Sequence, residues 1–144
     1  MRTELKDNYY YVWIGGSCDY NHKDRPGGGA YILQKGKDTI ETYTENDINT
    51  TEFRMLLKVM LHAMDTLPPQ STVIFNTNVS YLQNFDKEPS DKSSNKDLIR
   101  QCISSKSRHQ SVSLKILAYY KYETLQYAHN LANDAMKEAK HKTI

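Results

Sequence analysis

Short runs of apolar and aromatic residues alternate with polar stretches over the first third of the chain. Residues 9–14 are aromatic and β-branched, which predicts a strand, and the glycine pair that follows is expected to end it. A polar stretch and three glycines separate it from a second predicted strand at residues 30–33. Gly36 then permits a tight turn into a third strand at about residues 39–44. Strands this close in sequence predict an antiparallel meander.

The periodicity changes to that of a helix after the third strand. Hydrophobic residues recur at helical spacing over residues 53–64, Thr50 or Thr51 is placed to cap the start, and a Pro-Pro pair forces the end. This order of elements predicts an α/β fold in which helices cover the faces of a mixed sheet. The remaining expected elements are a strand at 72–75, a short helix at 79–85, a polar loop at 86–95, a helix at 96–106, a strand at 112–120 and a helix at 124–140.

Composition and charge restrict the function classes only weakly. The 144 residues fit a single domain, 1–144, with its core at about 9–140, and the net charge of +2 is too small to predict a nucleic-acid binder by itself. Cys18 and Cys102 are too few for a disulfide framework and suit a reducing cytoplasm, although a single bridge stays open. No apolar run approaches a membrane span and no secretion signal is visible, so we expect a cytoplasmic protein without membrane contact.

Four local patterns follow one another along these elements. They are Gly15-Gly16-Ser17 with Gly27-Gly28-Gly29-Ala30, then Thr51-Glu52-Phe53-Arg54-Met55-Leu56-Leu57, then Asn76-Thr77-Asn78-Val79-Ser80-Tyr81, and finally Ala128-His129-Asn130-Leu131-Ala132. Each pattern alone is common, but in this order they resemble the type 1 ribonuclease H (RNase H) family over nearly the whole chain. The resemblance implies a mixed five-stranded sheet, three antiparallel strands then two parallel ones, with helices on both faces.

The resemblance also implies where a catalytic site would lie. Family members hold two magnesium ions with four carboxylates from separate elements, and the matching positions here are Gly15, Leu56, Asn78 and His129. Magnesium requires hard oxygen ligands, and none of these four residues is a carboxylate. We therefore predict a catalytically degenerate member, a pseudoenzyme that holds no metal and no other cofactor.

Each of the four residues also has an ordinary structural explanation. Gly15 suits the backbone geometry of a strand end, and Leu56 lies on the apolar stripe of its helix. Asn78 is placed to cap the short helix that follows it, and His129 to pack at the edge of the core. An alternative is an active nuclease with displaced carboxylates, for which the candidates are Asp19, Glu52 and Asp134.

Binding without cleavage is a further implication of the resemblance. In the family, the glycine loop and the start of the first helix approach the nucleic-acid backbone, and amides at a helix N-terminus favour phosphate. Glu52 would repel phosphate there, whereas Lys35 and Lys37 add positive charge, and Tyr20 and Tyr31 are available for stacking. The binding candidates are Ser17, Cys18, Asn21, Lys23, Arg25, Thr51 and Arg54, and a short basic cluster follows at Lys106-Ser107-Arg108-His109, which is equally well a solvated loop.

Three functional hypotheses follow from these residues. The first is a non-catalytic RNase H-like domain that binds nucleic acid or serves as a scaffold, as in reverse transcriptase-related proteins. Its partner would be an RNA–DNA hybrid or another nucleic acid, bound weakly, or a protein or the rest of a larger polyprotein. The second is a protein-interaction domain without nucleic-acid contact. The third is a hybrid nuclease that uses the displaced carboxylates.

Overall fold

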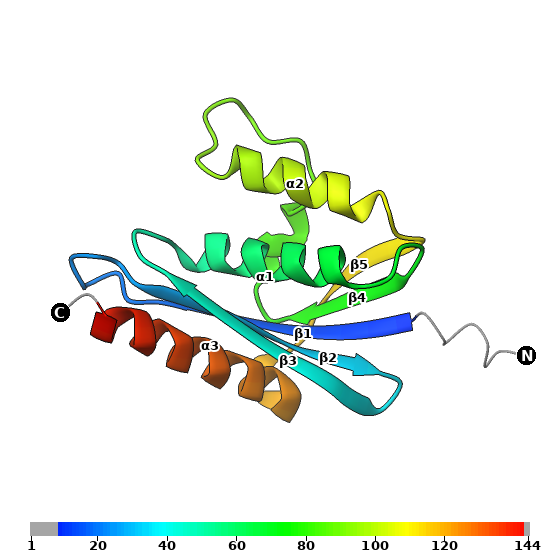
Figure 1. Ribbon diagram of the computed structural model, residues 1–144, viewed down its shortest axis with the longest axis horizontal. Helices are drawn as coiled ribbons and strands as arrows, with labels where there is room; N and C mark the ends of the chain where they lie inside the picture. The colour runs from blue at the N-terminus through cyan, green and yellow to red at the C-terminus, as the bar shows by residue number, and fades with distance from the viewer. Residues whose placement is uncertain (1–8, 143–144) are drawn as a thin grey trace, which may run out of the picture.

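Five strands form one mixed sheet in the computed structural model, which describes residues 9–142. The strands are β1 (Tyr9–Cys18), β2 (Gly27–Lys35), β3 (Asp38–Asp47), β4 (Thr72–Thr77) and β5 (Ser111–Ile116); the helices are α1 (Glu52–Thr66), α2 (Lys96–Lys106) and α3 (Glu123–Lys142), with 3-10 turns η2 (Ser80–Asn84) and η3 (Tyr119–Lys121). Their spatial order is β3-β2-β1-β4-β5, antiparallel as far as β1 and parallel from β1 to β5. Helices α1 and α2 lie on one face and α3 on the other (Figure 1). The predicted mixed sheet is confirmed.

Strand β1 is longer than the sequence suggests. Gly15 and Gly16 were expected to end it, but they pair with Ala30 and Gly29 of β2, and the strand continues to Cys18. The glycines that were expected to lead into β2 belong to that strand, which begins at Gly27. Glycine is disfavoured in a strand unless another backbone approaches closely, and here helices lie against the glycine-rich ends of both strands.

Helix α1 begins where the sequence places it. The Thr51 hydroxyl accepts a hydrogen bond from the Arg54 N–H (3.1 Å), so Thr51 rather than Thr50 is the N-cap. The apolar stripe of α1 packs against one face of the sheet, on residues such as Val12 and Phe75, and together they form the main core. Leu56 is fully buried within this core, as its place on the stripe predicts.

The end of β5 was predicted incorrectly. The expected strand reached Tyr120, but β5 stops at Ile116 because its partner β4 ends at Thr77. One further bond, from the Leu117 N–H to the Thr77 carbonyl (2.8 Å), closes the ladder. The chain then turns through η3, which places Tyr119 and Tyr122 at the start of α3.

Helix α3 packs closely on β1 and β2 through small residues. An added Cβ at Gly28 would lie 2.2 Å from the Ala132 carbonyl oxygen, so helix and strand approach nearly backbone to backbone. The helix begins beside Trp13, whose ring lies 5.8 Å from that of Tyr122. Near its other end, the ammonium of Lys140 pairs with Asp19 (2.7 Å). Helix α3 therefore covers only part of one face of the sheet. It begins beside Trp13 and leaves the residues of β1 that precede Trp13 uncovered on this face.

Two further expectations concerned a disulfide bridge and a membrane span. Cys18 and Cys102 are both free thiols, so no bridge joins them. Among the helices of residues 9–142, none is long and apolar enough to cross a bilayer.

Candidate functional site

A cleft of about 220 Å³ opens where β4 ends and its pairing with β1 stops, and it brings together three of the four positions matched to the family's carboxylates. Gly15, Asn78 and His129 line it. The fourth position, Leu56, does not, because its side chain is fully buried in the core. We call this the strand-end cleft. Its other polar lining residues are Glu52 and Tyr119.

Gly15 is explained by helix packing and not by the backbone geometry of a strand end. Its φ is not in the left-handed region, where Gly36 (φ 65°) is the one glycine found among the described residues. An added Cβ would lie 2.7 Å from the backbone of Ala128 and the amide nitrogen of His129. Helix α3 thus occupies the space into which a side chain at position 15 would project.

Asn78 does not cap η2 as predicted. The residue before η2 is Val79, which makes no side-chain cap, and the Val79 N–H donates instead to the Thr77 hydroxyl (3.1 Å). The Asn78 side chain is exposed at the mouth of the strand-end cleft. His129 is half-buried and packs edge-on against the ring of Tyr119 (5.7 Å), which agrees with its expected place at the edge of the core.

Glu52 is the one carboxylate among the residues that line the strand-end cleft, and it is engaged by a neighbour. The Tyr81 hydroxyl donates to Glu52 Oε1 (2.8 Å), and its ring packs edge-on against Phe53 (5.5 Å). Burial raises the pKa of Tyr81, and the bond to the Glu52 carboxylate raises it further, so the phenol stays protonated. The Glu52 N–H donates to the Tyr20 hydroxyl (3.0 Å), which occupies an amide at the start of α1. Tyr81 belongs to one of the four sequence patterns, but its contact with Glu52 could not be predicted, because only the folded chain brings η2 to this helix.

The other displaced carboxylates do not reach the strand-end cleft. Asp19 pairs with Lys140, whose hydrogen bond lowers the pKa of the Asp19 carboxyl. Asp134 is exposed on α3 and does not line the cleft. Among residues 9–142, no three His, Cys, Asp or Glu side chains are grouped to hold a metal. Magnesium needs several hard oxygen ligands, and one engaged carboxylate, an amide and an imidazole do not fit that requirement.

A second cleft, of about 320 Å³, lies between the starts of α1 and α2. Arg25, Thr51 and Arg54, three of the predicted binding candidates, line it together with Asn95, and we call it the arginine cleft. The Arg25 Nε donates to the Thr50 carbonyl (2.8 Å), and Arg54 Nη1 donates to Asn95 Oδ1 (3.2 Å). These bonds leave other guanidinium donors for a ligand, since each arginine carries five. Asp97 at the rim is the opposing charge.

Four other binding candidates lie outside the arginine cleft. The Ser17 hydroxyl donates to Asn133 on α3, and the Cys18 thiol is directed at the Thr50 carbonyl. Asn21 and Lys23 are exposed in the loop between β1 and β2. The sequence therefore named three residues of the arginine cleft but not Asn95, because Asn95 enters the cleft only through the packing of α2 on α1.

Two expected additions to a binding surface are wrong. Tyr31 is fully buried and cannot stack on a base; its hydroxyl is bonded to His62 (3.0 Å). Lys35 lies at the opposite end of β2 from Gly27, which is next to the arginine cleft, and Lys37 is in the turn beyond it. Their charge is not added to that of the arginines.

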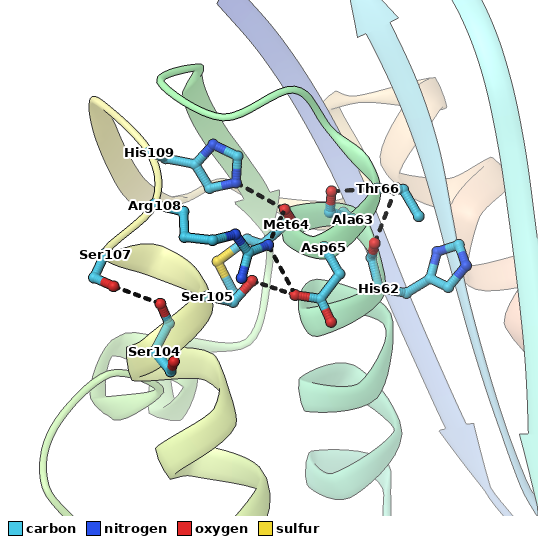
Figure 2. Close-up of polar contacts among 10 residues, drawn as sticks. All are labelled: His62, Ala63, Met64, Asp65, Thr66, Ser104, Ser105, Ser107, Arg108 and His109. Atoms are coloured by element: carbon cyan, nitrogen blue, oxygen red, sulfur yellow. Dashed lines mark hydrogen bonds and ion pairs between the residues drawn. The ribbon is translucent and has the colours of Figure 1, made fainter.

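The basic segment 106–109 is not a solvated loop. Lys106 pairs with Asp86, and Arg108 pairs with Asp65 at the end of α1 (3.1 Å). His109 is buried, with its Nε2 2.7 Å from the Met64 carbonyl oxygen (Figure 2). The Arg108 and His109 contacts fasten the segment after α2 to the end of α1, and Lys106 ties α2 to the loop after η2, so these side chains have structural roles.

The two thiols are expected to differ sharply in reactivity. Burial raises the pKa of Cys18, with Arg25 opposing the shift, and burial raises the pKa of Cys102 to about 12. Because the thiolate is the reactive form, at a pH of about 8 Cys18 should alkylate more slowly than free cysteine, and Cys102 only after unfolding. Mass spectrometry of iodoacetamide adducts over time, with and without denaturant, measures both rates. Equal labelling of the two in the folded protein would contradict this.

Solved structures of RNases H resemble this fold. No protein-family model matches the chain, and no curated protein matches it. The N-terminal RNase H domain of Rv2228c from Mycobacterium tuberculosis is 14% identical, with a TM-score of 0.78 over 96% of this chain and 100% of that one. LC9-RNase H1 is 17% identical (TM-score 0.74; 92% and 74% covered), and LC11-RNase H1, solved in complex with an RNA/DNA hybrid, is 14% identical (TM-score 0.74; 90% and 98% covered). At these identities the likeness establishes an RNase H-like fold.

Proposed function

We propose that this RNase H-like chain is a non-catalytic domain that binds nucleic acid through the arginine cleft. The observation that carries the proposal is the contrast between the two clefts. The strand-end cleft offers one carboxylate, Glu52, which is held by Tyr81. The arginine cleft, in contrast, places the guanidinium groups of Arg25 and Arg54 beside the N-cap of α1.

The absence of catalysis follows from the chemistry of the strand-end cleft. Hydrolysis by two metals requires ligands that fix both ions and so activate a water and stabilise the leaving oxygen. A residue without a side chain at position 15 and a buried leucine at position 56 provide no ligand. The remaining donors, Asn78 and His129, are a neutral amide and a nitrogen, which magnesium binds poorly. The proposal therefore assigns this cleft no hydrolytic role.

The binding role rests on the geometry of the arginine cleft. Arginine presents a planar fork of donors that suits phosphate oxygens, and two arginines at one cleft create a local positive potential despite a net charge of only +2. LC11-RNase H1, with a similar fold, holds an RNA/DNA hybrid. We infer the same class of ligand here, bound through its backbone. With few contacts and Asp97 at the rim, we expect weak affinity.

Hybrid binding is expected to be salt-dependent and to occur without cleavage. At low salt, Arg25→Gln and Arg54→Gln should each weaken binding of a fluorescent RNA–DNA hybrid about threefold to tenfold and lower the salt slope by roughly 1. Lys137→Gln removes the same charge from an exposed lysine of α3, on the other face of the sheet, and is the matched control. Fluorescence anisotropy across a salt series gives affinity and slope, and melting temperatures verify folding. Gel analysis with magnesium or manganese measures cleavage.

Two results would overturn the proposal. Metal-dependent cutting that Glu52→Gln abolishes would show that the strand-end cleft is an active site. An absence of hybrid binding at low salt would remove the nucleic-acid role and favour a protein-interaction domain. If Lys137→Gln weakened binding as much as Arg54→Gln, the attraction would be general and not located at the arginine cleft.

A further inference from the structure

The sheet face that carries α3 is only partly covered. Side chains alternate along β1, and Trp13 projects to the same face as Gly15, against which α3 packs. Helix α3 begins beside Trp13 and runs towards Asp19, so the half of this face from Trp13 back to Tyr9 lies beyond its start. In Figure 1, α3 accordingly lies under one half of the sheet, and the β2–β3 hairpin extends past it.

A cleft of about 260 Å³ lies on this uncovered half, and aromatic rings form much of its wall. Its residues come from neighbouring strands in register. Trp13 on β1 pairs with Asn76 on β4, which pairs with Lys115 on β5, and Tyr11 pairs with Gln34 on β2. Partners in register project to the same face, so these side chains form two adjacent rows. We call this group, with Tyr122 at its edge, the aromatic platform: Tyr11, Trp13, Gln34, Asn76, Lys115 and Tyr122.

The indole ring of the aromatic platform is held in place before any ligand arrives. The Trp13 Nε1–H donates to Gln34 Oε1 (2.9 Å), and the Tyr122 ring packs beside the indole at an interplanar angle of 43°. Trp13 remains partly exposed although it lies on the central strand of the sheet. A rigid and accessible indole offers a flat surface for a second planar ring, and little side-chain freedom is lost when that ring binds.

Asn76 supplies an unused hydrogen-bonding group at the same place. Its side chain is 3% exposed, and its Oδ1 has no hydrogen-bond partner in the described part of the chain. Buried polar groups are nearly always paired, so an unpaired amide at the wall of a cleft points to a partner outside the protein. A half-turn of the amide exchanges oxygen and nitrogen, so Asn76 can present an acceptor or a donor.

The charge of the aromatic platform identifies the chemical class of the ligand. Lys115 is exposed, and among the described lining residues it is the one that carries a charge, so the cleft favours an anion. An apolar peptide could pair with Asn76 through its backbone but would leave Lys115 unmatched. A nucleotide unit matches all three features, because its base is planar, the edge of the base carries donors and acceptors, and its phosphate is negative.

We propose that the aromatic platform binds single-stranded nucleic acid, with a base stacked on Trp13, its edge bonded to Asn76 and a phosphate beside Lys115. Bases inside a duplex are stacked on one another and cannot reach a protein ring, so the ligand is single-stranded. The platform lies on the face opposite α1 and α2 and uses none of the arginine-cleft residues. It is therefore a second site, independent of the proposed hybrid binding.

The chain provides its own reporter for this experiment, because Trp13 is its single tryptophan. Titration of the full chain with short oligo(dT) and oligo(A) strands is expected to quench its intrinsic fluorescence. Anisotropy of the same strands, labelled, should show Trp13→Leu weakening binding by about tenfold or more and Lys115→Gln by roughly twofold to fivefold, with a lower salt slope. Asn76→Ala should change the preference between the two strands, and melting curves verify that it folds. The exposed Lys92→Gln is the charge-matched control.

The outcomes separate the aromatic platform from the arginine cleft. Quenching that Lys115→Gln weakens and Lys92→Gln does not would support the proposal. Strand binding that Arg54→Gln abolishes, with Trp13 fluorescence unchanged, would overturn it and place single strands at the arginine cleft. If neither strand binds at low salt, the proposal is also wrong, and the platform would be a surface for a protein partner. Neither of the two contradicting results decides whether an RNA–DNA hybrid binds at the arginine cleft.

Discussion

Gly15→Ala is expected to destabilise the protein by about 3 kcal/mol, because the added methyl group meets the backbone of α3. The added Cβ would lie 2.7 Å from backbone atoms of Ala128 and His129, and a helix backbone cannot rotate away as a side chain can. Overpacking costs of about 1–3 kcal/mol arise even where neighbours adjust, and here α3 itself must shift. Denaturant unfolding measures the effect as a lower midpoint with an unchanged slope.

Gly16→Ala is the matched control for Gly15→Ala. Its Cβ would project to the other face, towards side-chain atoms of Leu56 (2.9 Å) and Glu52 (3.1 Å), which can move aside more easily. Both substitutions restrict the unfolded chain equally, so this contribution cancels in the comparison. We expect a loss of about 1 kcal/mol for Gly16→Ala. Equal losses for the two variants would contradict the account of Gly15 as the contact point of α3.

Much of the fold could be predicted because local pattern and tertiary structure agree over most of the chain. The apolar spacing of α1, a cap at Thr50 or Thr51 and the bounds of α2 were visible in the sequence, and the structure selects Thr51 as the cap. The glycines of β1 and β2 were misinterpreted for a physical reason. Glycine in a local pattern indicates a turn, whereas here it makes room for a helix distant in sequence, and no local pattern contains that helix.

The candidate site could be predicted only in outline. The resemblance to the RNase H family implied that Gly15, Leu56, Asn78 and His129 share one site, and the structure brings all but Leu56 to one cleft. The sequence could not show that Tyr81 engages Glu52, or that Asn95 faces Arg54, because both contacts depend on how η2 and α2 pack against α1. Tyr31 failed as a stacking residue for a related reason: alternation assigns a strand residue to one of two faces but does not say which face a helix covers.

Leu56→Glu is the second substitution with a large expected effect, and it tests whether the packing beside the strand-end cleft can accept a carboxylate at this position. Leu56 is fully buried, and Glu52 lies one helical turn before it on the same side. A buried, unpaired carboxylate is costly, and a like charge four residues away adds to the cost. We expect a loss of about 4 kcal/mol at a pH of about 8, within the range for uncompensated buried charges. Thermal or denaturant unfolding measures it.

The pH dependence of Leu56→Glu separates charge from packing. Burial raises the folded-state pKa of the new carboxyl above its value in the unfolded chain, so folding favours the protonated form. The charge penalty is therefore absent at a pH of about 4 and grows as the pH rises through the folded-state pKa. Leu56→Gln has the same shape without the charge and should keep the pH dependence of the parent chain. If Leu56→Glu matched Leu56→Gln at a pH of about 8 and were stabilised by magnesium, the strand-end cleft could still accept a metal ligand. If Leu56→Glu is less stable than Leu56→Gln and does not respond to magnesium, the helix contact at Gly15 and the packing around Leu56 both oppose carboxylates at these positions, as the proposed non-catalytic role expects.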